Sequence, residues 1–217
     1  MRLFFLKSAV FFSAILLIFF STAKSQDIGE VLGQEVNTIT TAVPFLMIAP
    51  DARSGAMGDV GVSTSPDANS MHWNPAKYAF VKEDMGLTAN YTPWLRNLVN
   101  DINLSYLSGF KRIDELQTVA ASLVFFSLGD IQFTDEAGNP QGIYRPSEFA
   151  IDLAYARKLG EHISGAIAVR YIHSNLTQGQ NVSSMETRPG RTLAADVSAY
   201  YHRELNWVNT PATFSAG

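Results

Sequence analysis

The feature of this sequence that most constrains its fold is an alternation of apolar and polar residues that recurs in six stretches. Because successive side chains of a strand point to opposite faces, such alternation predicts strands with one apolar face. In the clearest stretch, the apolar set includes Ile151 and Leu153, and the other set includes Asp152 and Ala154. The predicted strands span residues 85–93, 102–111, 117–128, 148–158, 163–174 and 192–203. Strands of this length can cross a bilayer at a tilt, so the sequence predicts an all-β, transmembrane antiparallel β-barrel.

The connections between these strands differ in length in a way that supports a membrane barrel. The longer connections are rich in Gly, Asn, Ser, Gln and Pro, and the connection at 94–101 is intermediate. Compact connections are expected at residues 112–116, 159–162 and 204–211, and long loops at 129–147 and 175–191. In outer-membrane barrels the short turns face the periplasm and the long loops face outside. The alternative is a soluble β-sandwich, which uses the same alternation of residues.

The first 25 residues have the features of a secretory signal peptide. Arg2 and Lys7 precede an apolar core at 9–20, which is shorter than the roughly 20 residues that a membrane-spanning helix needs. We therefore expect cleavage near Gln26 and export of the chain. Cleavage leaves 13 basic against 20 acidic side chains, a charge that argues against nucleic acid as a partner. The chain has no cysteine, which excludes disulfides and thiolate metal sites.

The segment between the signal peptide and the first strand does not alternate. It is composed of turn and short-helix material, in which Asp67 is a candidate helix cap and Asn74-Pro75 a candidate helix start. We predict that residues 26–84 fold back against the barrel wall as a hatch. Residues 85–217 then supply the first six to seven strands, the seventh opening near Thr213. Since such barrels have at least about eight strands, we expect this wall to be the N-terminal part of a longer one.

One set of residues in this segment carries a family resemblance. The motif consists of Asp51, Arg53, Gly55, Met57, Gly58, Asp59, Trp73, Asn74 and Pro75. It resembles the N-terminal region of FadL-like barrels, in which a short hatch precedes about 14 strands, an even number within the range of such barrels. By that resemblance the chain covers roughly the N-terminal half. More narrowly, residues 44–80 resemble the PorV family of the type IX secretion system of Bacteroidetes.

The resemblance implies a carrier in the outer membrane. Members of such a family are expected to bind a SprA/Sov-type translocon and to receive secreted cargo by its C-terminal signal domain. They then deliver the cargo to a PorU-type sortase at the cell surface. The alternative is a FadL-like transporter of small hydrophobic molecules, which needs a continuous apolar pocket of roughly 300 Å³ or more in its lumen. The inward residues are rich in Ala, Ser and charge, which favours the carrier.

Several residues are candidates for contacts within the protein or with a partner. Asp152, Arg170 and Asp196 have the lumen parity of their strands and could form a charged network. Within the hatch, Asp51, Arg53 and Asp59 could form an ion pair or contact a partner. On the first long loop, apolar anchors for a partner are expected at Phe133, Ile143 and Tyr144.

Aromatic residues near the strand ends could form the interfacial girdles of a membrane barrel. The candidates are Tyr91, Trp94, Phe110, Tyr155, Tyr171 and Tyr201. The four histidines lack metal-ligand spacing, and no nucleophile elbow or phosphate loop is present, so we expect no enzyme, metal or cofactor site.

Overall fold

A computed structural model describes most of the chain after residue 42. The described residues are 43–94, 101–134, 137–176, 181–182, 185–186, 189–207 and 210–217. The predicted signal peptide and the first part of the predicted hatch lie outside them. No helix in the described part of the chain is long and apolar enough to cross a membrane.

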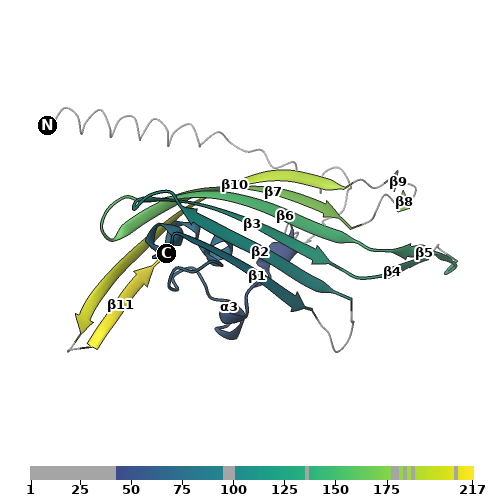
Figure 1. The fold of residues 1–217 in the computed structure, drawn as a ribbon. Coiled ribbons are helices and arrows are strands. Elements are labelled where there is room, and N and C mark those ends of the chain that lie inside the picture. The colour runs from purple at the N-terminus through teal and green to yellow at the C-terminus, as the bar shows by residue number, and fades with distance from the viewer. Residues whose placement is uncertain are drawn as a thin grey trace, which may run out of the picture. The chain divides into compact units, whose positions relative to one another are not determined.

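The main element is a curled antiparallel sheet of seven strands, here called the wall (Figure 1). Its order is β1-β2-β3-β6-β7-β10-β11, so each strand pairs with its neighbours in sequence apart from two inserted hairpins. The strands are β1 (Met85–Pro93), β2 (Asn103–Arg112), β3 (Gln117–Ser127), β6 (Ser147–Lys158), β7 (Ile163–Asn175), β10 (Gly190–Trp207) and β11 (Thr210–Ala216).

The six predicted strands are confirmed, and β1, β2, β3, β6 and β7 agree with the prediction within one residue at each end. The predicted compact connection at 204–211 is wrong in its extent, because β10 runs to Trp207 and β11 begins at Thr210. Backbone pairing continues there as Leu205 to Ala212 and Asn206 to Pro211. Proline is tolerated in a sheet on an edge strand, which is the place of β11 in the strand order.

Both predicted long loops contain short hairpins that the prediction missed. The first carries β4 (Ile131–Thr134) and β5 (Pro140–Tyr144), and the second carries β8 (Asn181–Val182) and β9 (Met185–Glu186). The β4–β5 pairing is interrupted by a register shift between Phe133 and Thr134. A bulge of this kind interrupts the alternation of residues between the two faces, so the strand cannot be recognised from its sequence pattern.

The two faces of the wall differ in chemistry, as the alternation predicts. From β1 to β10 the even-numbered residues face inward and the odd-numbered ones outward, and the cross-strand register keeps this parity. Large apolar side chains remain exposed on the outer face, with Leu87 at 77% and Val197 at 84% exposure. Phe110 has inward parity and is buried against Tyr78, so its expected place in an outer aromatic girdle is wrong.

Residues 43–84, here called the hatch, contain four short helical segments. These are η1 (Pro44–Met47), α3 (Ala52–Ala56), α4 (Ser70–Trp73) and η2 (Pro75–Phe80). Of these segments, η1, α4 and η2 contribute buried side chains against the inner face. One buried cluster lies where α4 and η2 meet the wall, and a second lies around Phe45 of η1 together with Leu104 and Tyr106 of β2.

Candidate functional site: the hatch and the charged inner face

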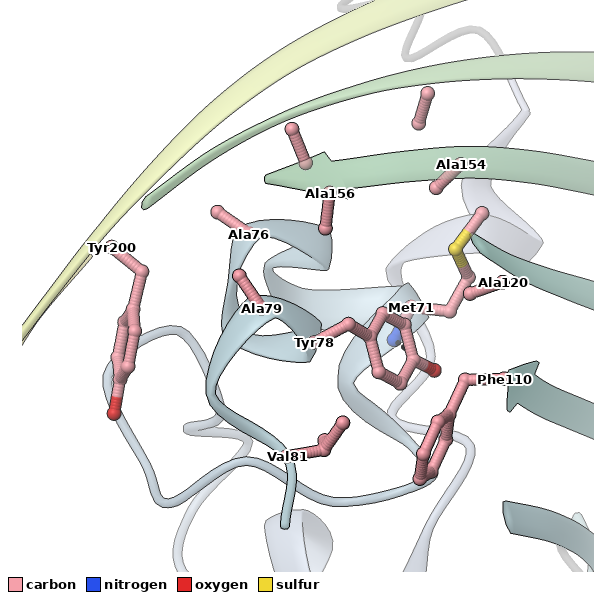
Figure 2. Packing of buried hydrophobic residues seen from close by; sticks show 12 residues of the cluster. Met71, Ala76, Tyr78, Ala79, Val81, Phe110, Ala120, Ala154, Ala156 and Tyr200 are labelled. Atoms are coloured by element: carbon pink, nitrogen blue, oxygen red, sulfur yellow. Dashed lines mark hydrogen bonds between the residues drawn. The ribbon is translucent and has the colours of Figure 1, made fainter. Parts of the chain in front are cut away.

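The contact between η2 and the wall is built from small side chains. Ala154 and Ala156 of β6, which are labelled in Figure 2, are buried in the same cluster as η2. Ala166 and Ala168 of β7 belong to this cluster as well. The helix contributes its own alanine at position 76, which is fully buried. Because an alanine side chain ends at Cβ, the helix backbone can approach the strands closely. The alanine-rich inner set therefore packs directly against η2.

Hydrogen bonds attach the start of η2 to β7 and β10. The Asn74 side chain donates from Nδ2 to the carbonyl oxygen of Ala199 over 2.9 Å. The Ala76 backbone N–H donates to Ser198 Oγ over 3.2 Å, and Ser164 Oγ donates to the Ala76 carbonyl over 2.6 Å. Asn74 also caps η2, since its Oδ1 accepts from the Ala76 N–H at 3.0 Å. The predicted helix start at Asn74-Pro75 is thereby confirmed.

A tyrosine attaches the hatch to β2. The Tyr78 hydroxyl donates to the Ala68 carbonyl over 2.9 Å and accepts from the Met71 N–H over 3.0 Å. Ser108 of β2 donates to the same Ala68 carbonyl over 2.8 Å. Burial raises the pKa of the Tyr78 hydroxyl, so this group stays protonated and available as a donor. In Figure 2 the Tyr78 ring lies between Met71 and Phe110.

Asp51 is the first residue of the motif and organises the hatch from within. Its Oδ1 accepts from the Ser54 N–H at 2.8 Å, which caps α3, and its Oδ2 accepts from Trp73 Nε1 at 3.2 Å. Burial alone raises the pKa of the Asp51 carboxyl, but the hydrogen bonds from Ser54 and Trp73 outweigh burial and leave the pKa below its usual value. The residue therefore links α3 to the end of α4 as a carboxylate.

The ion pair expected in the hatch involves Arg53, and its partner is Asp67. The two side chains are 3.1 Å apart, and Arg53 also donates to Ser65 Oγ over 2.9 Å. Asp67 itself accepts from the Asn69 N–H at 3.1 Å, which forms a turn before α4. Asn69 holds the N-cap position of α4, so the assignment of Asp67 as a helix cap is wrong; in the hatch, the side chains of Asp51 and Asn74 cap α3 and η2.

The remaining motif positions meet backbone and packing needs. Gly58 and Asp59 both have positive φ, at 80° and 60°, and end the α3 turn. Gly55 and Met57 are exposed. Pro75 occupies the first turn of η2, where its missing N–H costs nothing.

Lys77 is a site residue that sequence reasoning missed. It is 1% exposed, and its Nζ donates to the Gly61 carbonyl and to Thr64 Oγ1, both at 2.9 Å. Burial lowers the pKa of this ammonium to about 8. Tyr200 of β10 donates to the Thr64 carbonyl over 3.2 Å, so Thr64 accepts hydrogen bonds both from the hatch, through Lys77, and from the wall. The signal that could have identified Lys77 is its position inside the apolar run from Ala76 to Phe80.

The three predicted lumen charges lie together on the inner face. Arg170 Nε donates to Asp152, which is 2% exposed, and Arg170 Nη1 lies 3.9 Å from Asp196. Ser122 donates to the second oxygen of Asp152 over 2.8 Å. A ligand or cargo role for this network stays a prediction.

A histidine of the hatch faces this network. Burial, and secondarily the charge of Arg170, lower the pKa of His72 to about 4, so its ring is neutral at neutral pH. The ring lies edge-on to Trp73, with centroids 4.7 Å apart. Within the ranges that the structure covers, no group of three potential ligands is placed to hold a metal ion.

The predicted partner-contact residues are divided between the two faces of the β4–β5 hairpin. Phe133 and Tyr144 pack on each other with ring centroids 5.0 Å apart, whereas Ile143 is 65% exposed. At the base of the hairpin, Arg145 forms an ion pair with Asp130. Hydrogen bonding to Arg145 lowers the pKa of the Asp130 carboxyl. Ile143 is thus the predicted anchor that is open to a partner.

These features define a class of protein: a half-barrel wall with an apolar outer face, whose inner face is covered by an N-terminal hatch. The fold alone leaves the biological process open. A family model described as the type IX secretion system protein PorV matches residues 32–216. The chain belongs to this PorV family, which is a family of secretion-system proteins and not of enzymes. No curated protein matches the chain.

Proposed function

We propose that this chain is part of an outer-membrane carrier of the type IX secretion system. The carrier binds the C-terminal signal domain of secreted cargo at a SprA/Sov-type translocon and delivers the cargo to a PorU-type sortase. In this proposal the complete protein is a FadL-like barrel of about 14 strands, exported with a cleaved signal peptide. Membership of the PorV family supports the secretion system as the setting.

The observation that carries the proposal is the way in which the hatch is attached to the wall. The contacts through Asn74, Ser164 and Ser198 on one side and Tyr78 on the other close the space between η2 and the strands. A channel needs a path along that space, whereas a carrier can be sealed there. Apolar hollows of about 770 and 300 Å³ are present, and both lie on the outer face of the wall.

The rival function, transport of small hydrophobic molecules, is favoured by one further feature. A groove of about 540 Å³ lies between the hatch and the end of β1, lined by Met47 and Ile48 on the hatch side and by residues 91–94 on the β1 side. Asp51 and Asp59 also line the groove, so it is less suited to a purely apolar solute. An uptake barrel would hold such a solute after purification, and a carrier would hold proteins.

The test is affinity purification of the complete gene product from detergent-solubilised outer membranes, with mass spectrometry of the bound proteins and lipids. Recovery of a very large translocon barrel together with proteins that share a C-terminal signal domain would support the carrier. A barrel that elutes only with fatty acid or a similar solute would contradict it.

A pair of matched variants tests whether the β4–β5 hairpin contacts the cargo or the translocon. Ile143→Ser removes the exposed apolar anchor on β5, and Ile113→Ser makes the same change at a residue that is 58% exposed at the short-turn end of the wall. We expect Ile143→Ser to reduce recovery of cargo or translocon and Ile113→Ser to leave it unchanged. Equal recovery from both variants would remove Ile143 from the partner contact.

A further inference from the structure

The outer face of the wall carries an apolar groove over β1, β2 and β3 that the proposed carrier function does not use. Its volume is about 770 Å³. The floor lies at Gly109 and Ala121, which are direct cross-strand partners and lack large side chains. Leu87, Leu107 and Leu123 form the sides. The groove therefore exists because two small residues replace bulky ones at adjacent outward positions.

The length of the groove along the strand is close to the thickness of one leaflet of a bilayer. It runs along β2 from Leu107 to Lys111, four residues apart, which corresponds to about 13 Å of strand. Half of the hydrocarbon core of a bilayer is about 15 Å. Lys111 lies beside the short connection to β3, at the end of the wall where periplasmic turns are expected.

The ammonium group of Lys111, at the short-turn end of the groove, is accessible to a ligand. Lys111 is exposed, and among the described residues no carboxylate lies within ion-pair distance of it. Two nearby acids are engaged elsewhere: Asp84 pairs with Arg112 at 2.8 Å, and Asp114 accepts from Leu116 and Gln117. An apolar groove that ends at a free ammonium matches an acyl chain that ends at a phosphate.

We propose that this groove is a binding site for one membrane phospholipid, with an acyl chain lying over Gly109 and Ala121 and the headgroup phosphate against Lys111. The inference rests on the outer-membrane location proposed above. It goes beyond general contact with lipid, because it assigns one lipid molecule to one position on the wall. The bound chain would fill a hollow that would otherwise leave the barrel surface poorly packed.

The experiment is native mass spectrometry of the complete gene product in mild detergent, titrated with palmitoyl-oleoyl phosphatidylglycerol. Ala121→Leu fills the groove, and Ala195→Leu makes the same change at an exposed outward position of β10. Lys111→Gln removes the phosphate contact, and Arg157→Gln removes an exposed outward charge at the same end of β6. We expect Lys111→Gln to weaken binding of the first lipid about fivefold, near the upper limit for a solvent-facing ion pair, and Ala121→Leu to weaken it by a similar factor because the added side chain occupies the place of the acyl chain.

Equal lipid affinity in the wild type and all four variants would overturn the site. Loss of a co-purifying protein from Ala121→Leu with unchanged lipid affinity would also overturn it, and would make the groove a protein contact. Heat-modifiable migration of each variant on a gel checks that it folds, and Lys111→Gln changes no packing. Membrane fractionation of the wild type tests the outer-membrane location separately, so failure of the location and failure of the lipid site give different results.

Discussion

Replacing Arg170 by methionine should destabilise the complete protein through the carboxylate that the substitution leaves behind. Asp152 has 3% of its side chain exposed, and Arg170 is the cation that faces it in the structure. Removing one partner of a buried pair typically costs 3–5 kcal/mol, since the other charge stays buried and uncompensated. Arg170 is 21% exposed and Ser122 still donates to Asp152, so we expect about 2–3 kcal/mol, at or below the low end of that range.

Two related variants distinguish the two possible causes of this destabilisation, which are the uncompensated Asp152 carboxylate and the mere loss of a contact made by Arg170. Asp196 is itself 55% exposed, so Asp196→Asn breaks only its 3.9 Å contact to Arg170 and should cost less than about 1 kcal/mol. The double variant Asp152→Asn with Arg170→Met removes both charges and keeps an acceptor for Ser122. It should therefore be more stable than Arg170→Met alone by about 1–2 kcal/mol.

The assay is urea unfolding of the complete gene product in lipid vesicles, followed by tryptophan fluorescence and by heat-modifiable migration. If Arg170→Met lost no more stability than Asp196→Asn, the buried pair would not brace the inner face. If the double variant were less stable than Arg170→Met, the uncompensated carboxylate would not be the cause of the loss.

Three further predictions concern the hatch and its contact with the wall. Lys77 has a pKa of about 8 in the folded protein, against 10.5 when unperturbed, so the unfolded chain binds the Lys77 proton more tightly. The free energy of unfolding of the wild type should therefore rise between pH 8 and 10.5 relative to that of Lys77→Met, as measured by urea titration at each pH. Ala156→Leu should cost about 1–3 kcal/mol by overpacking against η2, while Ala195→Leu on the outer face should change stability by less than about 0.5 kcal/mol. In Gly61→Ala the new Cβ would lie 2.2 Å from Trp73 Cγ, so the indole must move, and its fluorescence maximum should shift.

The sequence allowed the wall to be predicted because one local rule governs it. Alternation along β6 and β7 places Asp152 and Arg170 on the same face, and the antiparallel register then makes them direct partners. The same rule applied to Phe110 would have placed it inside, since it shares parity with Tyr106 and Ser108. The girdle assignment failed because it used position near a strand end and ignored the face.

The hatch could be predicted as a compact segment but not in its contacts. The partner of Arg53 lies 14 residues away across irregular chain, and the hydrogen bond from Asn74 to Ala199 spans 125 residues. No periodicity links such positions, and several acceptors are backbone carbonyls that every residue carries. The burial of Lys77 is likewise a consequence of tertiary packing, which overrides the usual exposure of lysine.

The attachment of the hatch bears on where partners can bind. Displacing η2 from the wall would break the contacts made by Asn74, Ser164, Ser198 and Tyr78 together, each with a net value of about 1 kcal/mol, and would also expose the alanine-lined cluster. A cost of several kcal/mol corresponds to displacement in fewer than about one molecule in a thousand. The hatch and wall therefore act as one rigid unit in the resting protein. In the carrier proposed above, partners therefore bind to surfaces other than the contact between hatch and wall, and among the described residues these include the hairpin that bears Ile143, the groove beside the end of β1 and the apolar outer face.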